Sequence, residues 1–208
     1  MVSAVGETLD RPLLAAFADV LDYPRAPVAD SVRACEALAA ARSPEAASLL
    51  AGFRALAEGQ PLGELQEAYT LAFDLDSMSD LEPTCYPYVG HHLFDENPKR
   101  SAFLVGLNER YHAHGFTAEG ELPDHLVVLL RFLAVCDDEA LAAELLHDAV
   151  VPGLERMAGK AGEPGEAASG RVRYLALLRA LLLALTDGEA RAESTDVTTS
   201  ELAPSGRD

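Results

Sequence analysis

Apolar side chains recur at intervals of three and four residues in almost every segment of this chain, and strict alternation of apolar and polar residues is nearly absent. This spacing puts the apolar residues on one face of an α-helix, whereas alternation would put them on one face of a β-strand. In segment 123–136, for example, the apolar face contains Leu126, Leu129, Leu130 and Leu133. The sequence therefore predicts an all-α fold.

About eight segments follow the helical pattern, separated by proline, glycine or capping residues. The predicted helices cover residues 13–21, 28–41, 44–56, 61–73, 98–114, 123–136, 138–157 and 171–186. Ser43-Pro44-Glu45 is a strong helix start, because it combines a capping hydroxyl, a proline in the first turn and an early acidic residue. We expect a kink or break near Pro152, because proline cannot donate the helical hydrogen bond.

Residues 74–97, between the fourth and fifth predicted helices, show no sustained period. So long an irregular stretch is uncommon in a compact helical domain unless it is functional or contains short helical turns. The segment also carries aromatic residues and the pair His91-His92. We therefore predict a single-domain helical bundle with a long functional loop between its fourth and fifth helices.

The 208 residues are enough for one well-buried domain. The helical pattern ends near residue 186, and the remainder is rich in Glu, Thr, Ser, Pro and Gly, which cannot form a core. We predict an all-helical domain over residues 1–186 and a disordered acidic and polar tail over residues 187–208.

Charge limits the partners of this chain. With 16 Lys and Arg against 34 Asp and Glu, the formal net charge is −18. Such a charge repels nucleic acids and anionic membranes and favours a basic partner. The longest apolar run is interrupted by Arg179 and is too short to span a bilayer, and Met1–Asp10 lacks the pattern of an export signal. We therefore expect a cytoplasmic protein that does not insert into membranes or bind nucleic acid.

Motifs for catalysis are missing from the sequence. Cys35, Cys85 and Cys136 lie about fifty residues apart and form no CxxC pair, and no GxSxG elbow or phosphate-binding loop occurs. We predict no catalytic residue, cofactor or metal. The alternative is a metal-dependent hydrolase, and it would use imidazole ligands drawn from His91, His92, His112, His114 and His125.

Three short motifs follow one another in a characteristic order. They are Tyr69-x-x-x-Phe73, then Glu82-Pro83 with Tyr86 and Tyr88 shortly after, then Glu121-x-Pro123-Asp124-His125 before a leucine-rich helix. In these motifs, and in its helical pattern from about residue 10 to residue 186, the chain resembles the maturation chaperones of molybdenum oxidoreductases, the TorD/DmsD/NarJ family. The stretch 86–94 is closer to the NarJ-like branch that serves respiratory reductases and dehydrogenases.

The resemblance implies a cytoplasmic chaperone, present as a monomer or weak homodimer. It would bind the N-terminal leader or the apo form of the catalytic subunit of a molybdopterin oxidoreductase and hold it for cofactor insertion and assembly or export. The peptide-binding residues implied in this way are Tyr69, Phe73, Glu82, Pro83, Tyr86, Tyr88, Glu121, Pro123, Asp124 and His125.

A leader with a basic head and an apolar segment requires a groove that is acidic at one end and apolar along its floor. The carboxylates expected at the acidic end are Glu82, Asp95, Glu96, Glu121 and Asp124. The expected floor consists of Tyr69, Phe73, Tyr86, Tyr88, Leu93 and Phe94. For His125 we prefer a buried neutral hydrogen-bond partner to a pH-sensitive release group.

Overall fold

The computed structural model describes residues 9–73, 85–95, 97–161 and 170–200, and it describes the side chains of the last helix as far as Asp187. Within these ranges the secondary structure is helical and no strand is formed, so the predicted all-α fold is confirmed. The helices are α1 (Arg11–Leu21), α2 (Ala29–Arg42), α3 (Pro44–Gly59), α4 (Leu62–Phe73), α5 (Val89–Phe94), α6 (Pro98–Ala113), α7 (Leu126–Val135), α8 (Glu139–Leu145), the π-helical turn η1 (Leu146–Val150), α9 (Val151–Ala161) and α10 (Gly170–Ser200).

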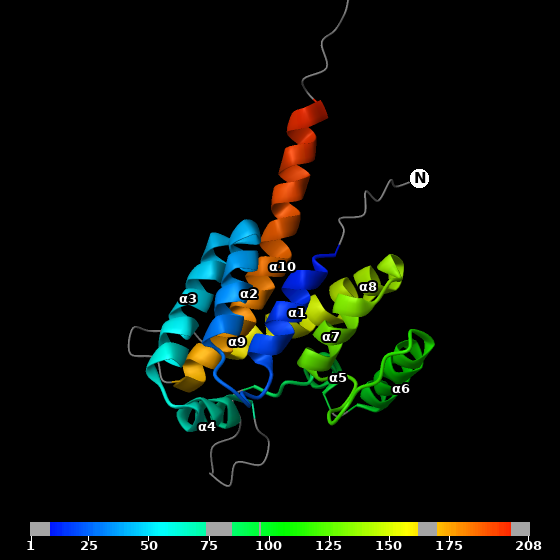
Figure 1. Ribbon diagram of the computed structural model, residues 1–208. Helices are drawn as coiled ribbons and strands as arrows, with labels where there is room; N and C mark the ends of the chain where they lie inside the picture. The colour runs from blue at the N-terminus through cyan, green and yellow to red at the C-terminus, as the bar shows by residue number, and fades with distance from the viewer. Residues whose placement is uncertain (1–8, 74–84, 96, 162–169, 201–208) are drawn as a thin grey trace, which may run out of the picture.

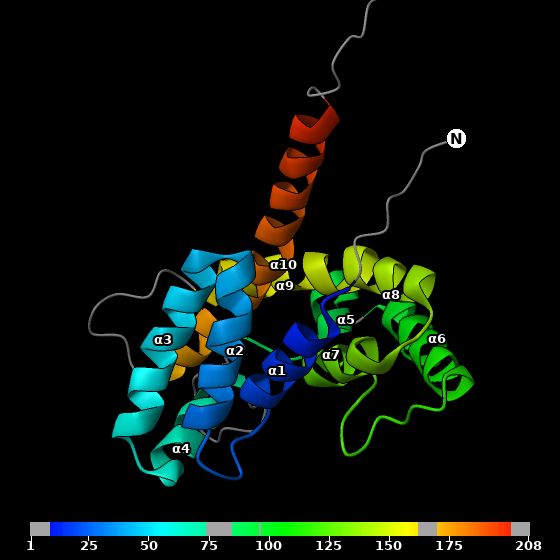
Figure 2. The ribbon, with the colours of Figure 1, turned by 45° about the horizontal axis from the view of Figure 1, so that its top comes forward.

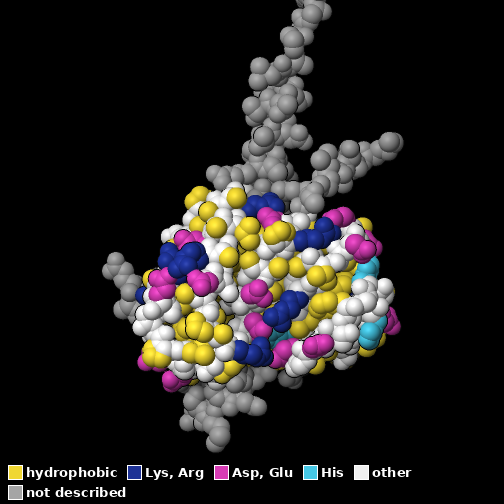
Figure 3. All heavy atoms as spheres, in the orientation of Figure 1, with side chains coloured by type: hydrophobic (Ala, Val, Ile, Leu, Met, Phe, Trp, Pro, Cys, Tyr) yellow, Lys and Arg dark blue, Asp and Glu magenta, His cyan; other side chains and the backbone are white. Residues whose placement is uncertain are grey.

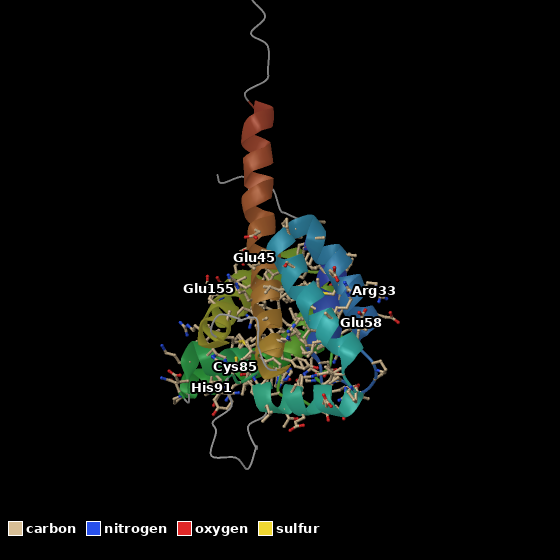
Figure 4. All side chains as sticks on the ribbon, turned by 90° about the vertical axis from the view of Figure 1, so that its left-hand side faces the viewer. Arg33, Glu45, Glu58, Cys85, His91 and Glu155 are labelled. Atoms are coloured by element: carbon tan, nitrogen blue, oxygen red, sulfur yellow. The ribbon has the colours of Figure 1, made fainter. Side chains whose placement is uncertain are left out.

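The first part of helix α10 lies within the bundle, and its C-terminal turns project beyond the other helices (Figure 1). It packs against α3 and α9 and also contacts α4, and Figure 4 shows it between α9 and the α2–α3 pair. Figure 2 shows α2, α3 and α4 on one side of the molecule and α6 and α8 on the other, with α1 between them. The largest fully buried side chains include Phe17, Phe53, Tyr111, Phe132 and Tyr174, which come from five different helices. One core therefore holds both sides together.

Local capping signals begin α1 and α3 close to where the sequence predicts. The Asp10 side chain accepts a hydrogen bond from the Leu13 amide at 3.1 Å and caps α1. The Ser43 hydroxyl accepts one from the Ala46 amide at 3.3 Å and caps α3, with Pro44 in the first turn. These side chains satisfy amides that have no partner within the helix.

The expected break near Pro152 is confirmed. The predicted helix 138–157 consists of α8, the π-helical turn η1 and α9, and Pro152 is the second residue of α9, just after this turn. Proline has no amide proton for a bond to the carbonyl four residues earlier, and a wider turn accommodates this gap in the hydrogen-bond ladder.

The second half of the predicted loop contains the short helix α5, while residues 74–84 lie outside the described residues.

The end of the last helix differs from its prediction. The sequence predicts an end at Thr186 and a disordered tail over 187–208, whereas α10 continues to Ser200. The reason is that Glu, Ala and Arg dominate residues 189–193, that all three favour helix, and that no proline occurs before Pro204. The Ser43 hydroxyl donates a 2.7 Å hydrogen bond to Asp187, one turn beyond the last described buried side chain, Ala184. The domain boundary near residue 186 stays a prediction.

No described helix is both long enough and apolar enough to cross a membrane. On the face drawn in Figure 3, acidic and basic side chains lie next to one another among apolar ones. The large negative charge of the chain is therefore not concentrated into one acidic area on this face.

Candidate functional site

A pocket of about 540 Å³ lies where the end of α1, helix α4, the start of α7 and two connecting segments meet. Its lining residues are Asp22, Tyr23, Arg25, Tyr69, Thr70, Phe73, Pro87, Tyr88, Glu119, Gly120, Glu121, His125, Val127, Val128 and Arg131. The walls therefore combine aromatic rings with both acidic and basic groups.

The structure brings five of the ten predicted site residues together in this pocket. They are Tyr69, Phe73, Tyr88, Glu121 and His125. Pro123 and Asp124 are buried behind the pocket wall, and Tyr86 packs on His91 with ring centroids 4.4 Å apart. Glu82 and Pro83 lie outside the described residues.

Four further residues of the expected groove are placed elsewhere or not described, and one of them, Leu93, packs on the core of the bundle. Asp95 is exposed at the end of α5, and Phe94 packs on Phe103 of α6 rather than on the pocket. Glu96 lies outside the described residues. Of the described carboxylates expected at the acidic end, Glu121 lines the pocket, whereas Asp95 and Asp124 do not.

Aromatic rings form the floor of the pocket. The ring centroid of Tyr69 lies 5.4 Å from that of Tyr23, 5.0 Å from that of Phe73 and 5.5 Å from that of Tyr174. These spacings are those of favourable edge and tilted ring contacts. Burial raises the pKa of Tyr69, and the nearby carboxylates Asp22 and Glu121 raise it further, so its hydroxyl stays protonated.

One wall depends on a backbone pairing between two segments that are distant in sequence. Tyr88 and His125 form an isolated antiparallel bridge. The Val89 amide donates to the Asp124 carbonyl and the Leu126 amide to the Pro87 carbonyl, each at 2.8 Å. The prediction of a helix from Pro123 was therefore wrong at its start, because the backbone of residues 124–126 pairs with residues 87–89 before α7 begins at Leu126.

His125 caps helix α7 from within the pocket. Its Nδ1 accepts a hydrogen bond from the Val127 amide at 3.2 Å, so the neutral ring carries its proton on Nε2. Burial lowers the pKa of His125; Glu121, Asp22 and Asp124 oppose that shift, and Arg131 adds to it. His125 is thus held as a neutral hydrogen-bond partner, the role that we preferred from the sequence.

We expect the stability of the protein to fall as the pH drops below about 6.5, the ordinary pKa of histidine. Because the folded state holds the pKa of His125 below that value, the unfolded state binds more protons there and acid favours unfolding. Urea denaturation between about pH 7 and pH 5 measures this effect. The His125→Asn variant keeps a capping group that does not titrate, so its stability should fall less between these two pH values. Equal losses of stability in the variant and the wild-type protein would contradict the assignment of the effect to His125.

Asp22 and Arg131 form a charged wall that sequence reasoning missed. Arg131 donates to Asp22 at 2.8 Å, and Arg25 lies 3.3 Å from the same carboxylate. Burial by itself raises the pKa of Asp22. The hydrogen bonds from Arg131 and the Tyr23 amide, together with the charges of Arg131 and Arg25, outweigh burial, so the pKa of Asp22 is lowered overall. One signal could have found this wall, because Arg131 is the single charged residue of the otherwise apolar helix α7.

Asp124 is fully buried, with 0% of its side chain exposed, and pairs with Arg100 of α6. The Arg100 Nε and Nη2 atoms lie 3.0 and 3.4 Å from the two carboxylate oxygens of Asp124. The carboxylate expected to meet a basic peptide is therefore already neutralised by a residue of this chain. The Asp124 side chain does not line the pocket.

The histidines of the hydrolase alternative are not gathered. His125 lines the pocket, and His114 lies 3.3 Å from Asp137. His91 and His92 lie side by side on α5, with ring centroids 5.4 Å apart. Within the part of the chain that the structure describes, no three His, Cys, Asp or Glu residues are grouped so that they could hold a metal ion. The arrangement does not favour the hydrolase.

The structure is that of an all-helical protein in which residues just before α5 and the segment before α7 complete one pocket. A family model described as the nitrate reductase delta subunit matches residues 37–158, more than half of the chain. The chain belongs to this family, which is one of molybdoenzyme maturation chaperones, and the resemblance to the NarJ-like branch is confirmed. No curated protein matches the chain.

Proposed function

We propose that this protein is a cytoplasmic maturation chaperone that binds the N-terminal leader or the apo form of the catalytic subunit of a molybdopterin oxidoreductase. It would hold that subunit for cofactor insertion and for assembly or export, without a catalytic step of its own. The family supports a molybdoenzyme client. The matched residues 37–158 include the α4 and α7 walls of the pocket.

The observation that carries the proposal is a pair of exposed carboxylates that line the pocket beside an aromatic floor. Glu119 and Glu121 are exposed and line the pocket, and neither forms an ion pair with a described Arg, Lys or His. Among the described residues, Glu121 accepts a 3.1 Å hydrogen bond from the Tyr88 hydroxyl. A basic leader residue can pair with these carboxylates while an apolar neighbour covers Tyr69 and Phe73.

The test uses a set of synthetic peptides, which we call the leader panel. Each peptide carries the first residues, about 30, of one molybdopterin oxidoreductase catalytic subunit of the source organism. Isothermal calorimetry with the full chain should show binding of at least one peptide. A panel that does not bind at all would contradict the proposed function.

Removing the two carboxylates should weaken that binding. The double variant Glu119→Gln, Glu121→Gln should bind the best peptide of the leader panel about tenfold more weakly, because two exposed ion pairs contribute up to about 1 kcal/mol each. Its affinity should also respond less to salt between about 0.1 M and 1 M, where the screening length falls from about 10 Å to 3 Å. The matched control is Glu109→Gln, Glu155→Gln, which removes the same charge from exposed residues outside the pocket lining; equal losses in the two double variants would show a general charge effect.

A further inference from the structure

We propose that Arg100, which lies outside the pocket lining, is a positioning residue for leader binding. It would hold Tyr88 and Glu121 in the arrangement that receives a basic residue. The inference rests on the proposed function and deepens it, because a residue of α6 would then fix the position of the Glu121 carboxylate at the pocket.

Arg100 contacts both segments that form the wall of the pocket. Its guanidinium pairs with the buried carboxylate of Asp124 through two contacts, at 3.0 and 3.4 Å. The same guanidinium carbon lies 5.6 Å from the ring centroid of Tyr88, within the range of a cation–π contact. With 22% of its side chain exposed, Arg100 is largely enclosed behind this wall.

The position of Tyr88 in turn determines where Glu121 lies. The Tyr88 hydroxyl donates to the Glu121 carboxylate at 3.1 Å, and the Tyr88 ring packs edge-on against His125 at 5.3 Å. Burial and the charge and hydrogen bond of Glu121 raise the pKa of Tyr88 to about 12, so this hydroxyl remains a donor. A continuous series of contacts thus leads from Arg100 through Tyr88 to Glu121 in the pocket lining.

Gly90 shows how closely this wall is packed. A Cβ atom built on Gly90 would lie 2.6 Å from the Oδ2 atom of Asp124 and 3.0 Å from the ring of Phe103. No side chain can be added there without moving the Asp124 carboxylate. Glycine at this position therefore allows α5 to approach the Arg100–Asp124 pair.

The arrangement explains why an inaccessible ion pair lies next to a binding pocket. A charged rim selects a partner only when its groups are held in place before binding, because ordering them during binding costs conformational entropy. Arg100 is suited to this task since its planar guanidinium can pair with a carboxylate and stack on a ring at the same time. Lysine offers a single point charge and cannot reproduce both contacts.

The experiment is a double-mutant cycle on the full chain, with calorimetry against the best peptide of the leader panel. Arg100→Gln should weaken binding about tenfold, as expected when the support of a binding group is removed. Arg100→Lys should bind the peptide more tightly than Arg100→Gln but more weakly than the wild-type protein. Tyr88→Phe removes the hydroxyl bond to Glu121, and its effect should be strongly non-additive with that of Arg100→Gln, because both changes release the same carboxylate.

Two further variants separate positioning from stability. Arg100→Gln combined with Asp124→Asn leaves no unpaired buried charge, so it should fold if Arg100→Gln alone does not, and it should still bind weakly. Val32→Ala truncates a fully buried residue of α2, which contributes nothing to the pocket lining, and should lower the thermal midpoint while leaving affinity unchanged.

The outcomes distinguish this inference from the proposed function. Suppose that the wild-type protein binds a leader peptide and the folded Arg100 variants bind it equally well. The positioning role is then overturned and the proposed function stands. The same conclusion follows if the losses of binding free energy from the Arg100 substitutions simply add to the loss from Tyr88→Phe. If the wild-type protein binds no peptide of the leader panel, the proposed function itself fails.

Discussion

Asp124→Ala should lower the free energy of unfolding by about 3 kcal/mol, the largest loss of stability that we expect from a single polar residue of this chain. The substitution removes the fully buried partner of Arg100 and leaves a largely enclosed guanidinium without its carboxylate. It also empties the space against Gly90, where the carboxylate is tightly packed. Urea denaturation followed by circular dichroism at 222 nm, a signal of helix, measures this loss.

The matched control for this prediction is Asp124→Asn. The amide has nearly the same shape and can still accept one hydrogen bond from Arg100, so its loss should be smaller than that of alanine. A second control is Asp30→Ala, which breaks an exposed ion pair to Arg33 at 2.7 Å and should change stability by less than about 1 kcal/mol. If Asp124→Ala were no more destabilising than Asp30→Ala, the pair would not be structural.

Tyr69→Ala should reduce affinity for the leader panel by about 30-fold, or about 2 kcal/mol, which is typical of a central aromatic residue in a binding site. Tyr69 contacts three other aromatic rings, and its ring forms the middle of the pocket floor. Its removal takes away the apolar surface that a leader would cover. The helical circular dichroism should be retained, because the core of the bundle lies beneath this floor.

Two variants show whether the loss belongs to the pocket. Tyr69→Phe keeps the ring and should bind almost as well as the wild-type protein, since the hydroxyl is not required for apolar contact. Phe53→Leu loosens the same aromatic cluster from below, where Phe53 packs on Tyr174 at 4.7 Å, but Phe53 does not line the pocket. Phe53→Leu should reduce the stability of the protein and leave its affinity for the peptide unchanged. If Phe53→Leu lost as much affinity as Tyr69→Ala, the loss would come from the core and not from the pocket.

The candidate site was only partly predictable from the sequence. Tyr69 and Phe73 are one helical turn apart, so their common face follows from periodicity alone. The role of Asp124 could not be derived in this way, because its partner Arg100 is 24 residues away and its burial depends on α5 and α6. A carboxylate in a motif therefore looked like a ligand-facing group although it is a buried support.

Most of the helices, the starts of α1 and α3 and the break near Pro152 were determined by the sequence itself. Caps, prolines and apolar spacing act between residues only a few positions apart, so short stretches of chain contain all the groups involved. The pocket was decided only by the tertiary structure. Asp22 and Arg131 meet across 109 residues, and Tyr88 reaches His125 through a backbone bridge. Such contacts depend on how complete helices pack around one core. No local pattern specifies which charges that packing will pair and which, like Glu119 and Glu121, it will leave without an ion pair among the described residues.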